Sequence, residues 1–215
     1  RLSFLGFGTM NGKDGKPFKT REGGVMRLEN LIADIDEEMF TKIVENRSVR
    51  DKDARDTAKI VGLAAIKYGD LSNQATKDYI FDVDRFTSFE GNTGPYILYT
   101  IVRIKSILNR YVEAGGNLEA GEILPASNGS EKNLMLQLSG FGSMIESAFE
   151  EKAPHKICAY IYEVSNAFNS FYHETKILSE ENQAQKESYI RLLQLTKRVL
   201  ETSIDLLGFE APDKM

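Results

Sequence analysis

The chain has 215 residues, enough for one large domain or for a domain with an appended segment. Hydrophobic residues make up 41% and charged residues 27%, so the chain can bury a sizeable core. No apolar run approaches the roughly 18 residues of a membrane span, and no signal peptide opens the chain, so we expect a cytoplasmic protein without membrane contact. The single cysteine, Cys158, excludes an internal disulfide framework and fits a reducing compartment.

The distribution of charge is more informative than its sum. A net charge of −5 argues against general nucleic-acid binding. Residues 1–21, however, sum to +4 and residues 92–112 sum to +3. Two basic islands in an acidic chain favour localised contact with a polyanion.

The first 26 residues show no helical period. We predict a strand over residues 2–7, a glycine-flanked basic loop, and a return at residues 25–26. A lone hairpin of this size is marginal in water, so the start is expected to belong to something larger.

Two helices are predicted next, over residues 27–45 and 51–68. Small residues form a packing face on the second one, and Gly69 and Asp70 are expected to end it. An extended piece at residues 79–81 precedes Asp82 and Asp84. These two carboxylates could bind a metal or pair with arginines, and pairing or solvation is the favoured interpretation.

From residue 92 onward the sequence predicts an antiparallel helical bundle, with helices over residues 93–112, 130–151, 154–173 and 179–207. Gly140 and Gly142 are expected to weaken the middle of the second of these. Gly208 is expected to stop the last one. The predicted core stripe of the 130–151 helix is Leu134, Leu138, Phe141, Ile145 and Phe149.

The helix over residues 93–112 carries two stripes. Its core-facing stripe has the 4-3-4 spacing and comprises Ile97, Ile101, Ile104 and Leu108. Tyr96, Tyr99, Arg103 and Arg110 share another face, and rings beside guanidinium groups suit single-stranded RNA, which needs faces for its bases and charge for its phosphates. The alternative is a core helix whose tyrosines only pack and whose arginines are solvated.

Few other residues carry a chemical pattern. His155 and His173 have only Cys158 nearby, which is no zinc spacing, and we expect no metal site and a buried, inert thiol. Residues 12–24 place four cations between glycines, so they could close over a phosphate chain. A flexible basic loop without function is the alternative.

Residues 12–24 resemble the second signature loop of class I aminoacyl-tRNA synthetases, in the form found in arginyl-tRNA synthetases. Three further blocks are similar to the same family, at residues 64–72 (AAIKYGDLS), 78–84 (DYIFDVD) and 88–96 (SFEGNTGPY). Shorter matches follow at residues 154–157 with Tyr160, at residues 171–172, at residues 207–208 and at the terminal Met215. The blocks are in the family's order and cover essentially the whole chain.

The resemblance implies a mainly α-helical fold in three parts. Residues 1–26 would be the end of the catalytic domain with the signature loop, a short β and loop remnant. Residues 27–83 would be a two-helix region contacting the tRNA stem. Residues 84–215 would be the antiparallel helical bundle that binds the anticodon.

The implied function is that of the C-terminal part of an arginine–tRNA ligase. It would bind the anticodon region of arginine tRNA and supply the ATP-side loop for ATP-dependent arginylation, with Mg as the companion ion. The loop residues that carry over are Lys16, Lys19, Thr20 and Arg21. The family's usual Lys-Met-Ser-Lys-Ser order is absent, so no single lysine is assigned the catalytic role.

The anticodon contacts implied by the resemblance are Tyr99, Tyr172 and Met215, with Tyr96 and Arg103 as neighbours in the same motif. Arginine and ATP would be bound through an upstream catalytic domain that this sequence lacks. We therefore expect these 215 residues alone to be inactive in arginylation, and to be monomeric. The alternative is a stand-alone helical scaffold that binds tRNA or another protein without catalysis.

Overall fold

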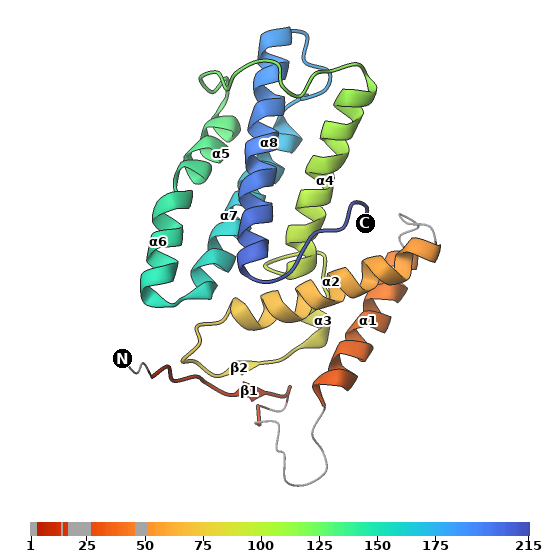
Figure 1. Ribbon diagram of the computed structural model, residues 1–215, viewed down its shortest axis with the longest axis vertical. Helices are drawn as coiled ribbons and strands as arrows, with labels where there is room; N and C mark the ends of the chain where they lie inside the picture. Colours follow the sequence, from red (N-terminus) through yellow and green to blue (C-terminus); the bar gives the residue numbers. More distant parts are fainter. Residues whose placement is uncertain (1–3, 14, 17–26, 46–50) are drawn as a thin grey trace.

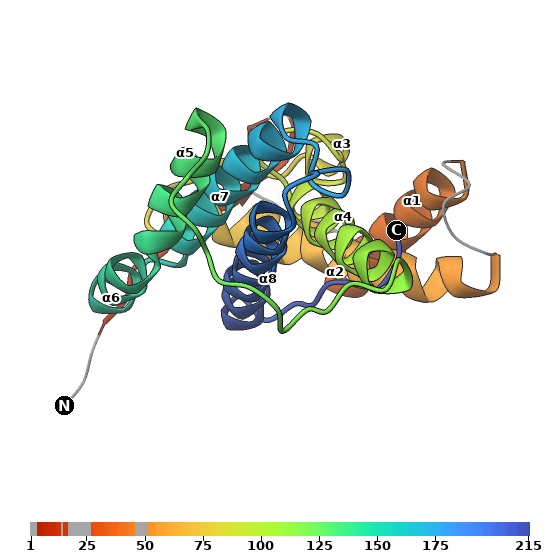
Figure 2. The ribbon, with the colours of Figure 1, turned by 90° about the horizontal axis from the view of Figure 1, so that it is seen from above.

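The computed structural model describes residues 4–13, 15–16, 27–45 and 51–215, without the side chains of residues 51 and 52. Most of the described chain is helical. The helices α4 (Gly94–Glu113), α7 (Pro154–Glu174) and α8 (Gln183–Leu206) run along the long axis, and α2 (Asp51–Leu71) crosses beneath them (Figure 1). Viewed from above, α7 lies between α5 (Gly129–Ser139) and the pair formed by α4 and α8 (Figure 2). The predicted mainly helical bundle is confirmed.

The first two helices form an antiparallel pair below the bundle (Figure 1). The helix α1 (Leu28–Glu45) buries Leu31, Ile35, Met39 and Ile43, which recur every four residues. On α2 the predicted small-residue face, Ala58, Val61, Ala64 and Ala65, is buried, and α1 approaches α2 at Gly62, where a Cβ would lie 3.4 Å from Cγ2 of Ile35. Small side chains on α2 allow the two helices to approach closely, as the pattern predicts.

The helix α2 continues to Leu71, three residues past its predicted end. Gly69 lies inside this helix because the ring of Phe86 packs directly on it. A Cβ at residue 69 would lie only 2.5 Å from Cδ2 of Phe86. Here a glycine serves close packing and does not end the helix.

The N-terminal segment differs from the prediction. Residues 4–9 form no strand, and Phe4 is 93% exposed. The strand β1 (Met10–Asn11) pairs in parallel with β2 (Tyr79–Ile80), so its partner lies far along the chain and the predicted hairpin is wrong for the described residues. The predicted return at residues 25–26 lies outside the described part. Local hydrophobicity could not reveal this pairing because the partner is about 70 residues away.

Asp82 and Asp84 are paired, which was among the favoured interpretations, but their partner is a lysine and not an arginine. Asp82 caps the short helix α3 (Val83–Phe86) by accepting from the backbone N–H groups of Asp84 and Arg85. The Nζ atom of Lys13 lies 3.2 Å from Asp82 Oδ1 and 2.6 Å from Asp84 Oδ2. This pair joins the segment after β1 to α3, which accounts for the two carboxylates without a metal.

The predicted 130–151 helix is two helices, α5 and α6 (Phe141–Glu151), separated at Gly140. Gly140 is the C-cap of α5 and the N-cap of α6. Leu134 and Leu138 on α5 are buried, as predicted, but Phe149 on α6 is 83% exposed. The break at Gly140 interrupts the helical period, so beyond it Phe141 and Ile145 are only half-buried and the stripe predicted for one straight helix does not continue to Phe149.

The remaining helix ends agree with the prediction to within a few residues. Asn182 caps α8 by accepting from Gln185 N, so this helix starts four residues later than predicted. Gly208 follows α8 with a φ of +80°, a conformation that glycine adopts without strain. The tail beyond it crosses α4 (Figure 1), where Lys105 Nζ donates to the carbonyl oxygen of Pro212 at 3.2 Å. Among the described residues no helix is long and apolar enough to cross a membrane.

We predict that Gly94→Ala destabilises the fold where α4 meets α2. A Cβ at residue 94 would lie 2.4 Å from the carbonyl oxygen of Ala64, so the two helices would have to separate. We expect the free energy of unfolding, measured by urea titration, to fall by about 1–3 kcal/mol. Gly129→Ala is the matched control, because Gly129 is likewise the first residue of a helix, after the cap residue Asn128, and has open space around its Cβ position. An equal effect of both substitutions would contradict the close approach.

We also predict the sign of a titration. The hydrogen bond from Lys13 holds the pKa of Asp84 below its usual range. Because the pKa is lowered in the folded state, the pair stabilises the fold above the ordinary aspartate pKa of about 3.9. This stabilisation is lost as the pH falls through the pKa of the folded state. A pH titration followed by carboxyl-carbon NMR should show a higher titration midpoint for Asp84 in Lys13→Met and an unchanged midpoint in Lys77→Met. If the midpoint in Lys13→Met stays where it is in the unsubstituted chain, the pair does not form in solution.

Candidate nucleic-acid interface

The candidate site lies on α4 and α7, where the two helices pack side by side. Thr93 caps α4 through its Oγ1, which accepts from Tyr96 N at 3.2 Å, and Pro95 occupies the first turn. The predicted core stripe of α4 is buried. Because residues recur about every 100° around a helix, Tyr96, Tyr99 and Arg103 then lie together on the side that faces α7.

Arg103 is the centre of this site. Its guanidinium carbon lies 4.7 Å from the ring centroid of Tyr99 and 5.1 Å from that of Tyr172 on α7. Both distances are within the range of cation–π attraction. The ring of Tyr99 is 41% exposed, and Tyr172 is half-buried, so both rings are held by the arginine and remain accessible.

A chain of hydrogen bonds fixes Arg103 from the other side. Arg103 Nη1 donates to Asn169 Oδ1 at 2.6 Å. Asn169 Nδ2 donates to the hydroxyl of Tyr96 at 2.9 Å, and this hydroxyl donates to Asn166 Oδ1 at 2.7 Å. The ring of Tyr96 also meets that of Tyr162 edge-on, with centroids 5.7 Å apart. We call this set the α4–α7 surface: Tyr96, Tyr99, Arg103, Tyr162, Asn166, Asn169 and Tyr172.

Burial raises the pKa of Tyr96, so its hydroxyl stays protonated at neutral pH and keeps its place in the chain of hydrogen bonds. The surface therefore presents aromatic faces, one fixed positive charge and neutral amides. Groups of this kind can stack on planar rings, attract a phosphate and exchange hydrogen bonds with a base.

Four of the five residues predicted to bind tRNA come together on this surface. Met215 does not join them. It ends the tail that Lys105 holds on α4, and it is half-buried against the core. None of the contacts found in the described part of the chain connects Met215 to Tyr99, Arg103 or Tyr172.

On α7 Tyr172 was predicted from the sequence, but three further residues of this surface were missed. Tyr162, Asn166 and Asn169 were not singled out, although they lie four and three residues apart and lead on to Tyr172. This spacing places the four side chains on one face of a helix whose other face is apolar. A search for polar stripes on both helices, rather than on α4 alone, could have found them.

The predicted ATP-side residues are placed only in part. Lys16 lies in a tight turn in which Gly12 N donates to the carbonyl oxygen of Lys16 at 2.9 Å, and Gly15 has a φ of +73°. Lys19, Thr20 and Arg21 lie outside the described residues.

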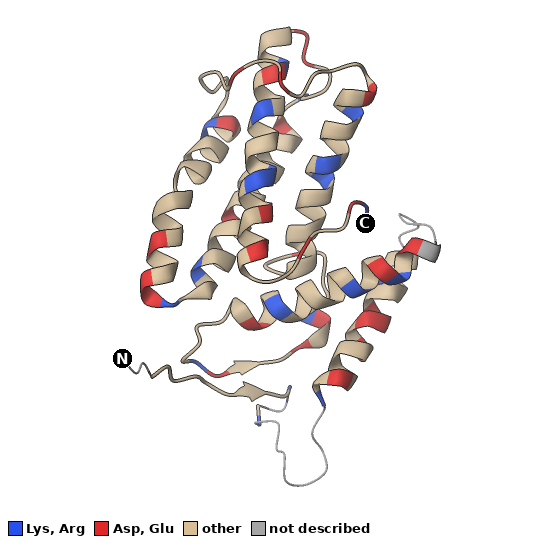
Figure 3. Cartoon of the chain, in the orientation of Figure 1, with Lys and Arg blue, Asp and Glu red and all other residues tan. Residues whose placement is uncertain are grey.

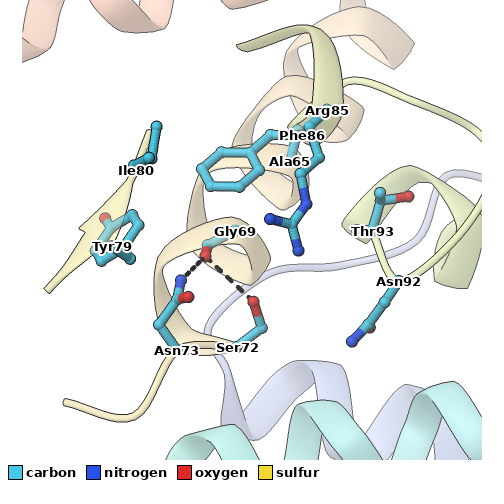
Figure 4. Close-up of a pocket in the computed structure, with 11 residues that line it drawn as sticks. Ala65, Gly69, Ser72, Asn73, Tyr79, Ile80, Arg85, Phe86, Asn92 and Thr93 are labelled. Carbon is cyan, nitrogen blue, oxygen red and sulfur yellow. Dashed lines mark hydrogen bonds between the residues drawn. The ribbon is translucent and has the colours of Figure 1, made fainter. Parts of the chain in front are cut away.

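Two other polar hollows lie on the described surface. One is lined by α2, α3 and the start of α4, and Figure 4 shows the guanidinium of Arg85 directed into it between Gly69 and the Asn92–Thr93 segment. Ser72 and Asn73 both donate to the carbonyl oxygen of Gly69 at its edge, at 3.2 and 2.6 Å.

The second hollow is a groove between α4, α8 and the tail. Figure 3 marks positions of Lys and Arg along α4 and α8 and positions of acidic residues on α1. Part of the positive charge in the groove is neutralised, since Lys105 and Lys197 both pair with Glu201, at 3.6 and 2.9 Å.

The described residues contain no group of three or more His, Cys, Asp and Glu side chains that could hold a metal ion. Cys158 is fully buried, and burial raises the pKa of its thiol to about 12. A thiol that is protonated and inaccessible at neutral pH is not a nucleophile, which agrees with the inert thiol that the sequence predicts.

Comparison with known proteins places this geometry in a family. Residues 97–215 match the family model described as the DALR anticodon binding domain, and residues 1–83 match that of the tRNA synthetases class I (R), catalytic domain. The whole chain is 67% identical to part of the arginine–tRNA ligase of Agathobacter rectalis and 57% identical to part of that of Alkaliphilus oremlandii. It spans 37% and 36% of the length of these two relatives.

Solved structures give the same result. The arginyl-tRNA synthetase of Thermus thermophilus matches 98% of this chain with a TM-score of 0.86 at 26% identity, over 35% of its own length. That of Plasmodium falciparum matches 98% of this chain with a TM-score of 0.80 at 26% identity, again over 35% of its length.

The bundle is therefore an anticodon-binding module of class I synthetase type. The chain belongs to the DALR anticodon-binding domain family, since that family's model covers more than half of it. Its organisation is that of the C-terminal part of an arginyl-tRNA synthetase, in which the end of a class I catalytic domain is followed by the DALR domain.

Proposed function

We propose that this chain acts as part of an arginine–tRNA ligase and that its α4–α7 surface binds unpaired nucleotides in the anticodon region of arginine tRNA. Residues 1–26 would close the catalytic domain, residues 27–83 would contact the tRNA stem, and residues 84–215 would bind the anticodon. The protein would act as a monomer in the cytoplasm.

The observation that carries the proposal is the position of Arg103 between Tyr99 and Tyr172. Two rings and a guanidinium held in this way already have the arrangement that a stacked base requires, so little side-chain freedom remains to be lost on binding. Stacking of a base on an aromatic side chain is worth about 1–3 kcal/mol. Two such rings beside a positive charge give a contact strong enough to measure.

The attachment of the surface supports the same function. Asn169 and Tyr96 hold Arg103 from behind, and the buried face of α4 anchors the helix in the core. A rigid surface is suited to recognising a loop of RNA whose bases are already unstacked. A tyrosine–arginine cluster that only filled space would not need an exposed ring such as Tyr99.

The ATP side of the proposal rests on Lys16, Lys19, Thr20 and Arg21. Their cationic and hydroxyl groups, on a loop rich in glycine, would bind the phosphates of ATP once the rest of the catalytic domain is present. Mg would neutralise phosphate charge in the complete site. The role of these residues in the whole enzyme would be to hold and orient the phosphate chain.

We predict that Tyr99→Ala and Tyr172→Ala each weaken binding of arginine tRNA to the 215-residue chain. Each substitution removes one stacking face, so we expect the dissociation constant to rise about 5- to 150-fold. Filter binding at one fixed salt concentration measures this, and circular dichroism melting checks that the fold is kept.

Phe149→Ala is the matched control, because Phe149 is an exposed aromatic residue on α6, away from the α4–α7 surface. The Phe149→Ala variant should bind arginine tRNA with the affinity of the unsubstituted chain. Unchanged affinity in both tyrosine variants would contradict the proposal and favour a helical scaffold that binds a protein partner.

A further inference from the structure

The hydrogen-bond chain on the α4–α7 surface has a fixed direction, and Arg103 sets it. A guanidinium can only donate, so Asn169 must turn its oxygen toward Arg103. The amide nitrogen of Asn169 then faces Tyr96, and the Tyr96 hydroxyl must accept from it. The hydroxyl proton is left to donate, and Asn166 Oδ1 accepts it at 2.7 Å, so Asn166 presents its oxygen to Tyr96.

This direction decides which atom Asn166 offers to solvent. With its oxygen occupied by Tyr96, the free end of the Asn166 side chain is the NH₂ group. The contacts of the described residues give this group no partner, and Asn166 is half-buried at the surface beside the rings of Tyr96 and Tyr162. The surface therefore presents a hydrogen-bond donor of fixed orientation next to its aromatic rings.

We propose that Asn166 donates a hydrogen bond from this NH₂ group to an acceptor on a nucleobase, either a carbonyl oxygen or a ring nitrogen. In the same proposal Asn169 is a positioning residue: it holds Arg103 between the two tyrosine rings and, through Tyr96, fixes the orientation of Asn166. The inference rests on the proposed function, because it assumes that RNA occupies the α4–α7 surface.

The chemistry fits a base better than a phosphate or a protein chain. An amide donor beside aromatic faces can bond to the edge of a ring while that ring stacks, which is how unpaired bases are recognised. A phosphate is bound most strongly by charged donors, and the charged donor here, Arg103, is already held between two rings and by Asn169. The contact would add selectivity for bases with an acceptor at the right place, whereas stacking accepts any base.

The test measures binding of an arginine anticodon stem-loop RNA to the 215-residue chain and to its Asn166→Ala variant. Loss of one neutral hydrogen bond should weaken binding about 3- to 10-fold. The same RNA is then made with acceptor-deficient base analogues at each loop position in turn. One analogue should weaken binding to the unsubstituted chain and have no further effect on Asn166→Ala. Asn133→Ala, an exposed asparagine on α5, is the control and should bind as the unsubstituted chain does.

Asn169→Leu tests the positioning role. Asn169→Leu should weaken RNA binding when it is the only substitution. It should have little further effect in the Arg103→Ala variant, because both substitutions interrupt the same chain of hydrogen bonds. The NMR signals of the Asn166 side-chain amide should also move in Asn169→Leu, which a residue that only fills space would not cause. If Asn169→Leu fails to fold, the Asn166 amide signals of the unsubstituted chain still decide, since they should shift when the stem-loop is added.

The outcomes distinguish a failure of the proposed function from a failure of the proposed role of Asn166. If Tyr99→Ala and Arg103→Ala bind as the unsubstituted chain does, RNA does not use this surface, and both the proposed function and this inference are overturned. If those variants weaken binding while Asn166→Ala does not, or if every base analogue acts additively with Asn166→Ala, only the inference is overturned.

Discussion

The hydroxyl of Tyr68 joins the parts of the molecule that carry the candidate surface. Tyr68 lies on α2 and is fully buried, with its hydroxyl oxygen 2.5 Å from Asn92 Oδ1 and 2.8 Å from the carbonyl oxygen of Cys158. Asn92 immediately precedes α4, and Cys158 lies in the first turns of α7. The single hydroxyl proton can be shared between these two oxygens or donated to one of them, and a buried hydroxyl left without an acceptor would be costly. The α4 and α7 helices are therefore held at a fixed separation where they meet α2. The close approach of Gly94 to Ala64 acts at the same place.

The geometry of the α4–α7 surface follows from this constraint. Arg103 can lie between Tyr99 and Tyr172 only if the two helices keep their register, because one ring comes from each helix. Asn169 and Tyr96 then add hydrogen bonds across the same interface. Each of these hydrogen bonds joins polar side chains that stay at least partly accessible, so the arrangement suits recognition of a ligand more than stabilisation of the core. The family match to the DALR anticodon-binding domain agrees with a surface of this kind.

Periodicity in the sequence was enough to predict most of the helices and the α4 half of the candidate site. The spacing of Ile97, Ile101 and Ile104 placed the core face of α4, and this also placed Tyr99 and Arg103 on another side. The partner residues on α7 depend on how two helices pack, which the spacing within one helix does not specify. Gly140 and Gly142 were expected to weaken the predicted 130–151 helix, but the helical pattern did not show that the chain forms two helices there or that Phe149 is exposed. The pairing of β1 with β2 depends on residues far apart in the sequence, and the hairpin predicted from local pattern alone was wrong.

The most direct test of the account is a photo-crosslink from the candidate surface to RNA. A photoreactive benzophenone side chain at residue 99 should crosslink to arginine tRNA, and the modified nucleotides should lie in the anticodon loop. The same group at residue 149, on the exposed face of α6, should give no crosslink there. Crosslinks from residue 99 that map only outside the anticodon region, or equal crosslinking from both positions, would contradict the account.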